Sequence, residues 1–261
     1  MTAPVVLAVL ASGLFQSGPS GGLPYYTADS IANSAAGVSG LYAPNTFVTI
    51  YGQNLAYTTR ALQPGDISSG TLPTVLPGTG LRVLLNGISA DIYYVSPTQV
   101  NFLVPTSLIA GPVNLQLVVD GAAGPAISIV LGTSAPSLFQ TDAITALGVH
   151  LDNSLITAAS PARPGEIVVL YATGVGPTSP AAIPDQIPRT AASVTPLSSF
   201  SLLMNGTAVD PHQILYVGVT PGFAGLFQIN WQVPSNAPAN PEIRIGYAGT
   251  LSPAGRVLPI Q

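Results

Sequence analysis

The chain has 261 residues, enough for one large or two medium domains that each bury a hydrophobic core. Charged residues make up 6% of it, the formal net charge is -4, and every basic residue is an arginine. This composition argues against a nucleic-acid partner, because neutralising phosphates requires a basic patch. The absence of cysteine excludes disulfides and thiolate metal sites. No stretch reaches the ~18 apolar residues of a membrane span, so we expect no integral membrane segment.

An uncharged apolar stretch opens the chain. Alternation places apolar side chains on both faces of a strand between Pro4 and Ala11, so such a strand would be buried on both sides. The basic residues that begin a typical signal peptide are missing before it. Gly and Ser dominate residues 17–22, which indicates a flexible linker. We therefore expect residues 1–24 to be an extra strand with a linker, able to reach a neighbouring subunit. The residues of this expected donor strand are Val5, Val6, Leu7, Val9 and Leu10.

Three blocks of the first half recur in the second half, in the same order. Residues 43–51 resemble 163–171, and residues 83–87 resemble 202–206. The third block reads Gln-Val-Asn-Phe-Leu-Val-Pro from Gln99 and Gln-Ile-Asn-Trp-Gln-Val-Pro from Gln228. Recurrence of separate blocks in one order indicates an internal duplication.

Each block is typical of a short strand, with alternating β-branched and aromatic residues between Gly, Pro or Asn. Asn86-Gly87 and Asn205-Gly206 predict hairpin turns, where both residues need positive φ. The sequence thus predicts an all-β fold of two tandem immunoglobulin-like antiparallel β-sandwiches, over residues 25–132 and 133–261, with the extra N-terminal strand. The residues expected in the two cores are Val48, Ile50, Val100, Phe102 and Val104, and Val168, Leu170, Ile229, Trp231 and Val233.

Several segments together resemble a known family. They are Asn33 to Ala36, Phe47 to Leu55, Tyr94 to Pro105, Ala135 to Phe139 and Pro161 to Pro177. In this order they are similar to the uncharacterised C-terminal domain that is abundant in secreted acidobacterial proteins. The resemblance covers about residues 25–261. It implies an exported immunoglobulin-like module with no known activity and no catalytic residues.

Residues that could carry out catalysis are sparse. Residues 18–22 fit the G-x-S-x-G pattern of a serine nucleophile, but they lie in the linker and not between a strand and a helix. His150 lies two residues from Asp152, and His212 follows a proline; we expect both histidines at the surface or in turns. The acidic residues are scattered singly and lack calcium-loop spacing. We therefore expect a non-enzymatic protein without catalytic, cofactor-binding or metal-binding residues.

Aromatic residues raise the alternative of sugar stacking. Tyr93, Tyr94, Tyr216 and Trp231 are candidates for an exposed platform, although Trp231 aligns with Phe102 in the duplication and so is expected in the core. Tyr25, Tyr26, Tyr51 and Tyr171 are left open. Asn205 also begins an N-glycosylation sequon, but the hairpin turn explains this asparagine fully.

Two functions follow from these patterns. The first is an extracellular or cell-surface structural subunit that polymerises with copies of itself by donating its N-terminal strand to a neighbour. The alternative is a monomeric adhesin or carbohydrate-binding module that contacts a surface polysaccharide.

Overall fold

A computed structural model describes residues 22–261, which form two compact units. The N-terminal unit contains residues 22–133 together with Ile183–Ile187. The C-terminal unit contains Ser134–Ala182 and Pro188–Gln261. The chain therefore leaves the C-terminal unit after Ala182, contributes a short stretch to the N-terminal unit, and returns at Pro188. We call Ile183–Ile187 the inserted segment.

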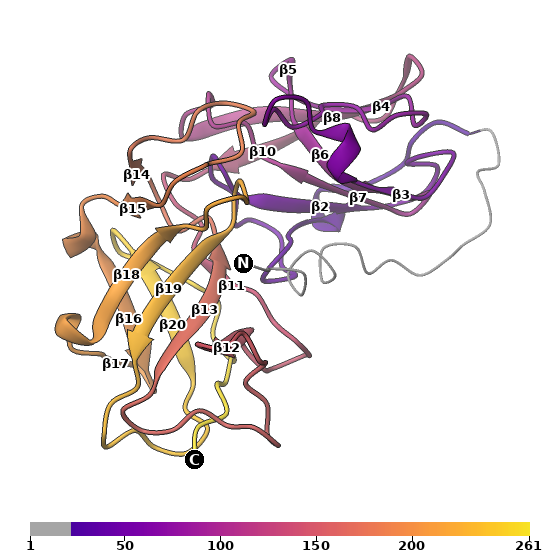
Figure 1. The fold of residues 1–261 in the computed structure, drawn as a ribbon. Coiled ribbons are helices and arrows are strands. Elements are labelled where there is room, and N and C mark those ends of the chain that lie inside the picture. Colours follow the sequence, from indigo (N-terminus) through magenta and orange to yellow (C-terminus); the bar gives the residue numbers. More distant parts are fainter. Residues whose placement is uncertain (1–21) are drawn as a thin grey trace. The chain divides into compact units, whose positions relative to one another are not determined.

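The N-terminal unit is built from two antiparallel sheets, which Figure 1 draws in indigo to magenta. Its first sheet has the order β1 (Ile31–Asn33), β2 (Phe47–Tyr51), β7 (Gln99–Leu103), β6 (Asp91–Val95), β3 (Arg60–Ala61). The second sheet has the order β10 (Ile127–Leu131), β8 (Gly111–Val119), β4 (Leu81–Leu85), β5 (Ile88–Ser89), and β9 (Ala122–Ala123) also pairs with β8. Two short 3-10 helices are η1 (Ala28–Ser30) and η2 (Pro64–Asp66).

The C-terminal unit repeats this architecture, in pink through orange to yellow in Figure 1. Its first sheet has the order β11 (Ser137–Leu138), β13 (Ile167–Thr173), β19 (Phe227–Gln232), β18 (Ile214–Val219), β15 (Ala192–Val194), β14 (Thr178–Ser179), and β12 (Gly148–His150) also pairs with β13. The second sheet has the order β17 (Thr207–Ala208), β16 (Phe200–Met204), β20 (Ile243–Tyr247), β21 (Thr250–Leu251). Its 3-10 helices are η3 (Leu197–Ser199) and η4 (Pro211–Gln213).

The duplicated blocks occupy equivalent strands in the two units. Strands β2, β7 and β6 are adjacent in one unit, as β13, β19 and β18 are in the other. Strand β4 pairs with β8 in one second sheet, and β16 pairs with β20 in the other. The prediction of an all-β fold with tandem antiparallel sandwiches is confirmed. The expected extra N-terminal strand falls outside the described residues.

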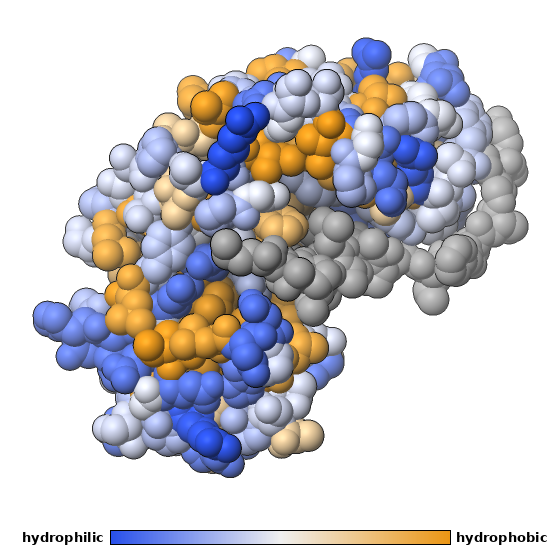
Figure 2. Space-filling model, viewed as in Figure 1, coloured by the Kyte–Doolittle hydropathy of each residue, from blue (hydrophilic) through white to orange (hydrophobic). Residues whose placement is uncertain are grey.

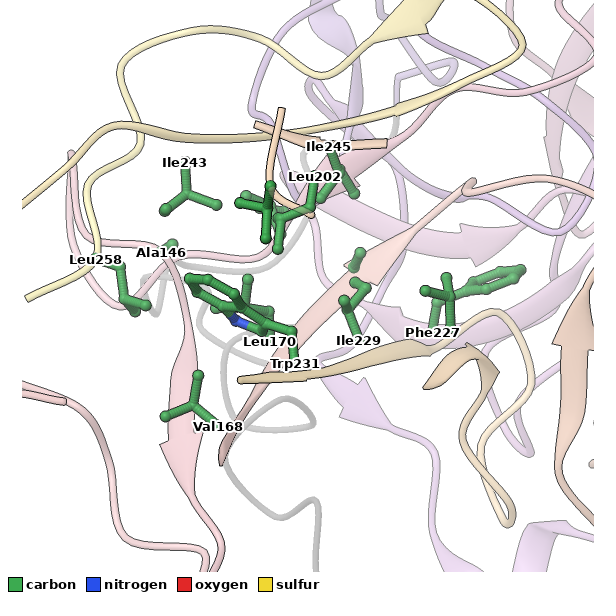
Figure 3. Packing of buried hydrophobic residues seen from close by; sticks show 14 of the residues in the cluster. Ala146, Val168, Leu170, Leu202, Phe227, Ile229, Trp231, Ile243, Ile245 and Leu258 are labelled. Carbon is green, nitrogen blue, oxygen red and sulfur yellow. The ribbon is translucent and has the colours of Figure 1, made fainter. Parts of the chain in front are cut away.

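Each sandwich encloses its own hydrophobic core between its two sheets. In the C-terminal unit Trp231 is completely buried, and it packs with Val168, Leu170, Ile243 and Leu258 (Figure 3). Inward-facing residues alternate with outward-facing ones along β19, which directs Ile229 and Trp231 into the core. All ten residues predicted for the two cores are fully buried, which confirms that prediction.

The two Asn-Gly pairs form equivalent hairpin turns. The φ angles are 49° and 81° at Asn86 and Gly87, and 49° and 78° at Asn205 and Gly206, as the turn type requires. Each asparagine side chain also binds a neighbouring segment. Asn86 Oδ1 accepts the N–H of Asn114 at 2.8 Å, and Asn205 Oδ1 accepts that of Glu242 at 2.8 Å. Asn205 thus has a structural role in its turn without any glycan.

Apolar side chains reach the surface in several groups with hydrophilic residues between them (Figure 2). Ile109, Ile183 and Leu23 are among the most exposed. In the described part of the chain, no helix has both the length and the apolar character needed to cross a bilayer.

Candidate functional site

The outer face of the first sheet in the C-terminal unit carries tyrosines next to amides. Tyr171 of β13 lies directly opposite Gln228 of β19, and Tyr216 of β18 lies opposite Asn230. The Gln228 Nε2 atom donates to Asn230 Oδ1 at 3.1 Å. Their strand neighbours Ile229 and Trp231 face the core, so these four side chains point away from it. We call them the C-terminal tyrosine–amide group.

The N-terminal unit contains the same group. Tyr51 of β2 lies opposite Gln99 of β7, and Tyr94 of β6 lies opposite Asn101. The Gln99 Nε2 atom donates to Asn101 Oδ1 at 2.9 Å. A bulge precedes the second tyrosine in each unit, because the register shifts between Ile92 and Tyr94 and again between Ile214 and Tyr216. The duplication has thus preserved a set of outward side chains as well as a core.

The two groups differ in their exposure to solvent. In the N-terminal unit Tyr94 and Asn101 are only 4% and 1% exposed, and Gln99 is also buried. In the C-terminal unit Tyr216, Gln228 and Asn230 are half-buried, so solvent reaches all three. Only the C-terminal group therefore offers an aromatic ring and both amides to a ligand.

Gly218 sets the position of the Tyr216 ring. A Cβ atom at Gly218 would lie 2.3 Å from the Tyr216 hydroxyl oxygen, so the phenol end of the ring occupies the space that a side chain would fill. The hydroxyl donates to Val219 O at 3.0 Å. The ring consequently lies along the strand, with one side toward the sheet. Partial burial raises the pKa of the Tyr216 hydroxyl above its ordinary value, which keeps it a neutral donor.

The surroundings of this ring are uncharged. Leu215, the extra residue of the bulge before Tyr216, is exposed, and Gln232 continues the row of amides on β19. Amides both donate and accept hydrogen bonds, as sugar hydroxyls do, and an aromatic ring offers a flat apolar surface. The arrangement suits a neutral polyhydroxyl ligand.

A second polar cluster lies in the C-terminal unit, in the wall of an open pocket of about 750 Å³. His150 Nδ1 pairs with Glu166 Oε1, and Glu166 Oε2 accepts the N–H of Arg163 at 2.8 Å. On its other side His150 Nε2 lies 3.3 Å from Ser160 Oγ and 3.2 Å from Ser160 O. Both histidines were expected at the surface or in turns. His212 is exposed, whereas His150 is only partly so, because Glu166 and the turn at Ser160 enclose most of its ring.

Ser160, His150 and Glu166 are connected in the order of a hydrolase triad, but the main chain at Ser160 and Pro161 offers no free N–H to an oxyanion. The N–H of Ser160 donates to Thr157 O, and the next residue is Pro161, which has no N–H. Oxyanion stabilisation is usually the largest contribution to acyl transfer. Both ring nitrogens of His150 face acceptors, Glu166 Oε1 at Nδ1 and Ser160 O at Nε2, which instead favours a protonated imidazole that clamps Glu166 to the turn.

This clamp predicts a pH dependence of stability. The hydrogen bond to Glu166, above all, raises the pKa of His150 over its ordinary 6.5, against the opposing effect of burial. The stabilisation is complete below pH 6.5 and is lost as the pH rises through the folded-state pKa. We expect His150→Gln to lose more stability at pH 6 than at pH 8.5 in urea unfolding. His212→Gln is the control, because that ring is 96% exposed; an equal loss for His150→Gln at both pH values would contradict the clamp.

Comparison with known protein families identifies one region of the chain. Residues 37–141 match the IPT/TIG domain family. The match covers most of the N-terminal unit and agrees with an immunoglobulin-like fold. No curated protein sequence matches the chain significantly.

Some solved structures are distantly similar. The SGBP-B protein of a Bacteroides ovatus mixed-linkage glucan utilization locus, in complex with a mixed-linkage heptasaccharide, is 13% identical with a TM-score of 0.32, over 85% of this chain and 40% of that one. The surface glycan-binding protein PbSGBP-B of Prevotella bryantii is 13% identical with a TM-score of 0.27, over 90% and 42%. SGBP-B from a complex xyloglucan utilization locus of Bacteroides uniformis is 14% identical with a TM-score of 0.26, over 90% and 49%. This chain spans less than half the length of each, and likenesses this weak carry no argument about function.

The structure decides most of the aromatic candidates. Trp231 is a core residue, as predicted. Tyr93 and Tyr94 are buried and cannot form an exposed platform, whereas Tyr216 is accessible. Of the tyrosines left open, Tyr25 and Tyr51 are exposed, and Tyr26 and Tyr171 are buried. Gln228 and Asn230 belong to the third repeated block of the sequence. This block indicates the duplication, and its amides were not predicted to be ligand-binding residues.

The predicted donor-strand residues Val5, Val6, Leu7, Val9 and Leu10 lie outside the described residues. Strand donation to a neighbouring subunit therefore stays a prediction. Within residues 22–261, no three His, Cys, Asp or Glu side chains gather to hold a metal ion.

Proposed function

We propose that this chain is a non-enzymatic, extracellular carbohydrate-binding module that holds a neutral polysaccharide on the outer sheet face of its C-terminal unit. The observation that carries the proposal is the ring of Tyr216, which lies over Gly218 beside the bonded pair of Gln228 and Asn230. The ring supplies a stacking surface, and the amides supply directional hydrogen bonds. This corresponds to the adhesin or carbohydrate-binding alternative of the sequence analysis.

The chemistry of the face favours an uncharged ligand. No Lys occurs in the chain, and the residues around the ring are amides and aliphatic side chains. An anionic polysaccharide would gain no ion pair with Tyr216, Gln228 or Asn230. A neutral glycan would lose little binding free energy on desolvation, because the amides form hydrogen bonds with its hydroxyls in place of the displaced water.

Affinity electrophoresis in gels containing soluble neutral glucans or mannans tests this proposal, with alginate as the anionic comparison. Tyr216→Ala is expected to weaken retardation by the neutral polymer about tenfold or more, because buried aromatic contacts dominate such interfaces. Tyr216→Phe keeps the ring and is expected to retain most of the binding.

Tyr57→Ala is a matched control, because Tyr57 is an exposed tyrosine of the N-terminal unit. Far-UV circular dichroism verifies that each variant folds. The proposal fails if no neutral polymer retards the wild-type chain, or if Tyr216→Ala and Tyr57→Ala bind equally well.

A further inference from the structure

The bonded amides of the C-terminal tyrosine–amide group keep unused hydrogen-bonding atoms. The Gln228 Nε2 atom donates to Asn230 Oδ1 at 3.1 Å. A hydrogen bond between two amides uses the nitrogen of one and the oxygen of the other, so one oxygen and one nitrogen remain. Here they are Gln228 Oε1, an acceptor, and Asn230 Nδ2, a donor, and neither is bonded to another residue in the described part of the chain.

Both unused atoms are open to a ligand. Gln228 and Asn230 are half-buried, and neither Gln228 Oε1 nor Asn230 Nδ2 is among the buried polar atoms that lack a partner within residues 22–261. Solvent therefore reaches both atoms. A ligand that covers this face displaces water from a donor and an acceptor on neighbouring side chains. It must bond both, because an unsatisfied polar group at a buried contact costs binding free energy.

Apolar side chains flank these amides. Strand β19 lies between β18 and β13 (Figure 1), and Asn230 is opposite Tyr216 on one of them and Val169 on the other. Residues opposite each other on neighbouring strands have Cβ atoms ~5 Å apart on the same face of the sheet. Val169 is half-buried, so part of its side chain is open to solvent. The site thus combines a donor and an acceptor with an apolar contact on either side.

The equivalent position in the N-terminal unit is polar. There Thr49 lies opposite Asn101, and its hydroxyl is hydrogen-bonded to Ser34 Oγ at 2.8 Å. Gln99 and Asn101 form the same amide pair, but both are buried. Of the two units, the C-terminal one therefore combines accessible amides with apolar neighbours on both sides.

We propose that the polysaccharide held on this face carries N-acetyl groups, and that Gln228 and Asn230 bind its acetamido group. This inference rests on the proposed function and names its substrate class. An acetamido group has an N–H, a carbonyl oxygen and a methyl group. Its N–H would donate to Gln228 Oε1, its carbonyl would accept from Asn230 Nδ2, and its methyl would contact Val169 while the sugar ring stacks on Tyr216. A sugar that carries only hydroxyls satisfies the amides but leaves the Val169 side of the site without an apolar partner.

Two tetrasaccharides separate these ligand classes. N-acetylchitotetraose and cellotetraose share one backbone linkage and differ only in the group at the second carbon of each sugar, acetamido in the first and hydroxyl in the second. In isothermal titration calorimetry with the full chain, we expect N-acetylchitotetraose to bind at least about tenfold more tightly, because a site that bonds a particular group rejects the analogue that lacks it.

Asn230→Asp tests the donor. Aspartate keeps an oxygen for Gln228 Nε2 but has no N–H for the acetyl carbonyl, whereas a sugar hydroxyl can donate to it. The preference for N-acetylchitotetraose is therefore expected to disappear, with little change in the affinity for cellotetraose. Asn236→Asp is the matched control, because it makes the same chemical change at an exposed residue outside the sheet. Tyr216→Ala is expected to weaken the binding of both tetrasaccharides.

The possible failures are distinguishable. Equal affinity of the wild type for the two tetrasaccharides, with both weakened by Tyr216→Ala, would overturn this inference and leave the proposed function standing. Binding of neither tetrasaccharide would overturn both. Full preference for N-acetylchitotetraose in folded Asn230→Asp would contradict the role of the amide pair. If Asn230→Asp fails to fold, the comparison of the two ligands on the wild type still decides the outcome.

Discussion

Trp231→Ala is expected to destabilise the C-terminal unit by about 3–5 kcal/mol. The side chain is completely buried and packs with Val168, Leu170, Ile243 and Leu258, so its removal leaves a large cavity. The measurement is urea unfolding followed by far-UV circular dichroism, with the transition of the N-terminal unit as an internal reference. A loss below about 1 kcal/mol would mean that the indole is not a packing residue.

Trp231→Phe distinguishes the contribution of side-chain volume to stability from that of the polar indole nitrogen. The indole Nε1 is buried and has no hydrogen-bond partner, so phenylalanine removes an unsatisfied donor while keeping an aromatic ring. We expect a cost of only about 1 kcal/mol. Phe102, fully buried at the equivalent strand position of the other unit, shows that the smaller ring suits this architecture.

Asp91→Asn is expected to stabilise the N-terminal unit at pH 8, because burial first, and the like charge of Asp185 second, raise the pKa of the Asp91 carboxyl to about 7. A folded-state pKa of about 7 lies above the ordinary 3.8, so the folded state holds its proton more tightly than the unfolded chain does. The contribution of Asp91 to the free energy of unfolding is therefore largest below pH 3.8 and falls as the pH rises to 7. Above pH 7 the ionised carboxylate costs the folded state on the order of 4 kcal/mol relative to low pH. Asparagine is uncharged at every pH and avoids this cost, although its amide also needs hydrogen-bond partners. We therefore expect the free energy of unfolding at pH 8 to rise by about 1–3 kcal/mol.

The pH profile of urea unfolding provides the measurement. The wild-type free energy of unfolding should fall between pH 4 and 7, and this slope should be absent in Asp91→Asn. Asp29→Asn serves as the control, because Asp29 is an exposed carboxylate of the same unit. Equal slopes in wild type and Asp91→Asn would show that the carboxyl is ionised throughout this range.

The fold could be predicted because its signals are local and occur twice. Alternation along residues 99–103 and 228–232 identifies strands, and the Asn-Gly pairs at Asn86 and Asn205 mark hairpins without reference to distant residues. Because each block recurs in the same order, a strand assigned in one copy must also fit the equivalent residues of the other copy. The buried positions followed from the same alternation.

The sites could not be predicted, because they depend on pairings between distant residues. His150 meets Glu166 only because β12 pairs antiparallel with β13, in a register that the sequence does not reveal. Tyr94 and Tyr216 occupy equivalent positions and differ in exposure, which depends on what packs over each sheet rather than on the strands themselves. Gln228 and Asn230 were visible in the sequence, but their direction and accessibility were not.

The inserted segment affects how the protein can be divided. A fragment cut at the covalent boundary after residue 133 would lack Ile183–Ile187, leaving the N–H of Leu72 and the carbonyl of Gly70 to solvent. The complementary fragment would carry this segment without the main-chain partners that hold it. Neither half of the gene therefore encodes a complete unit. Transfer of either half into another protein requires that Ile183–Ile187 be kept with the N-terminal unit or that residues 70–72 be redesigned.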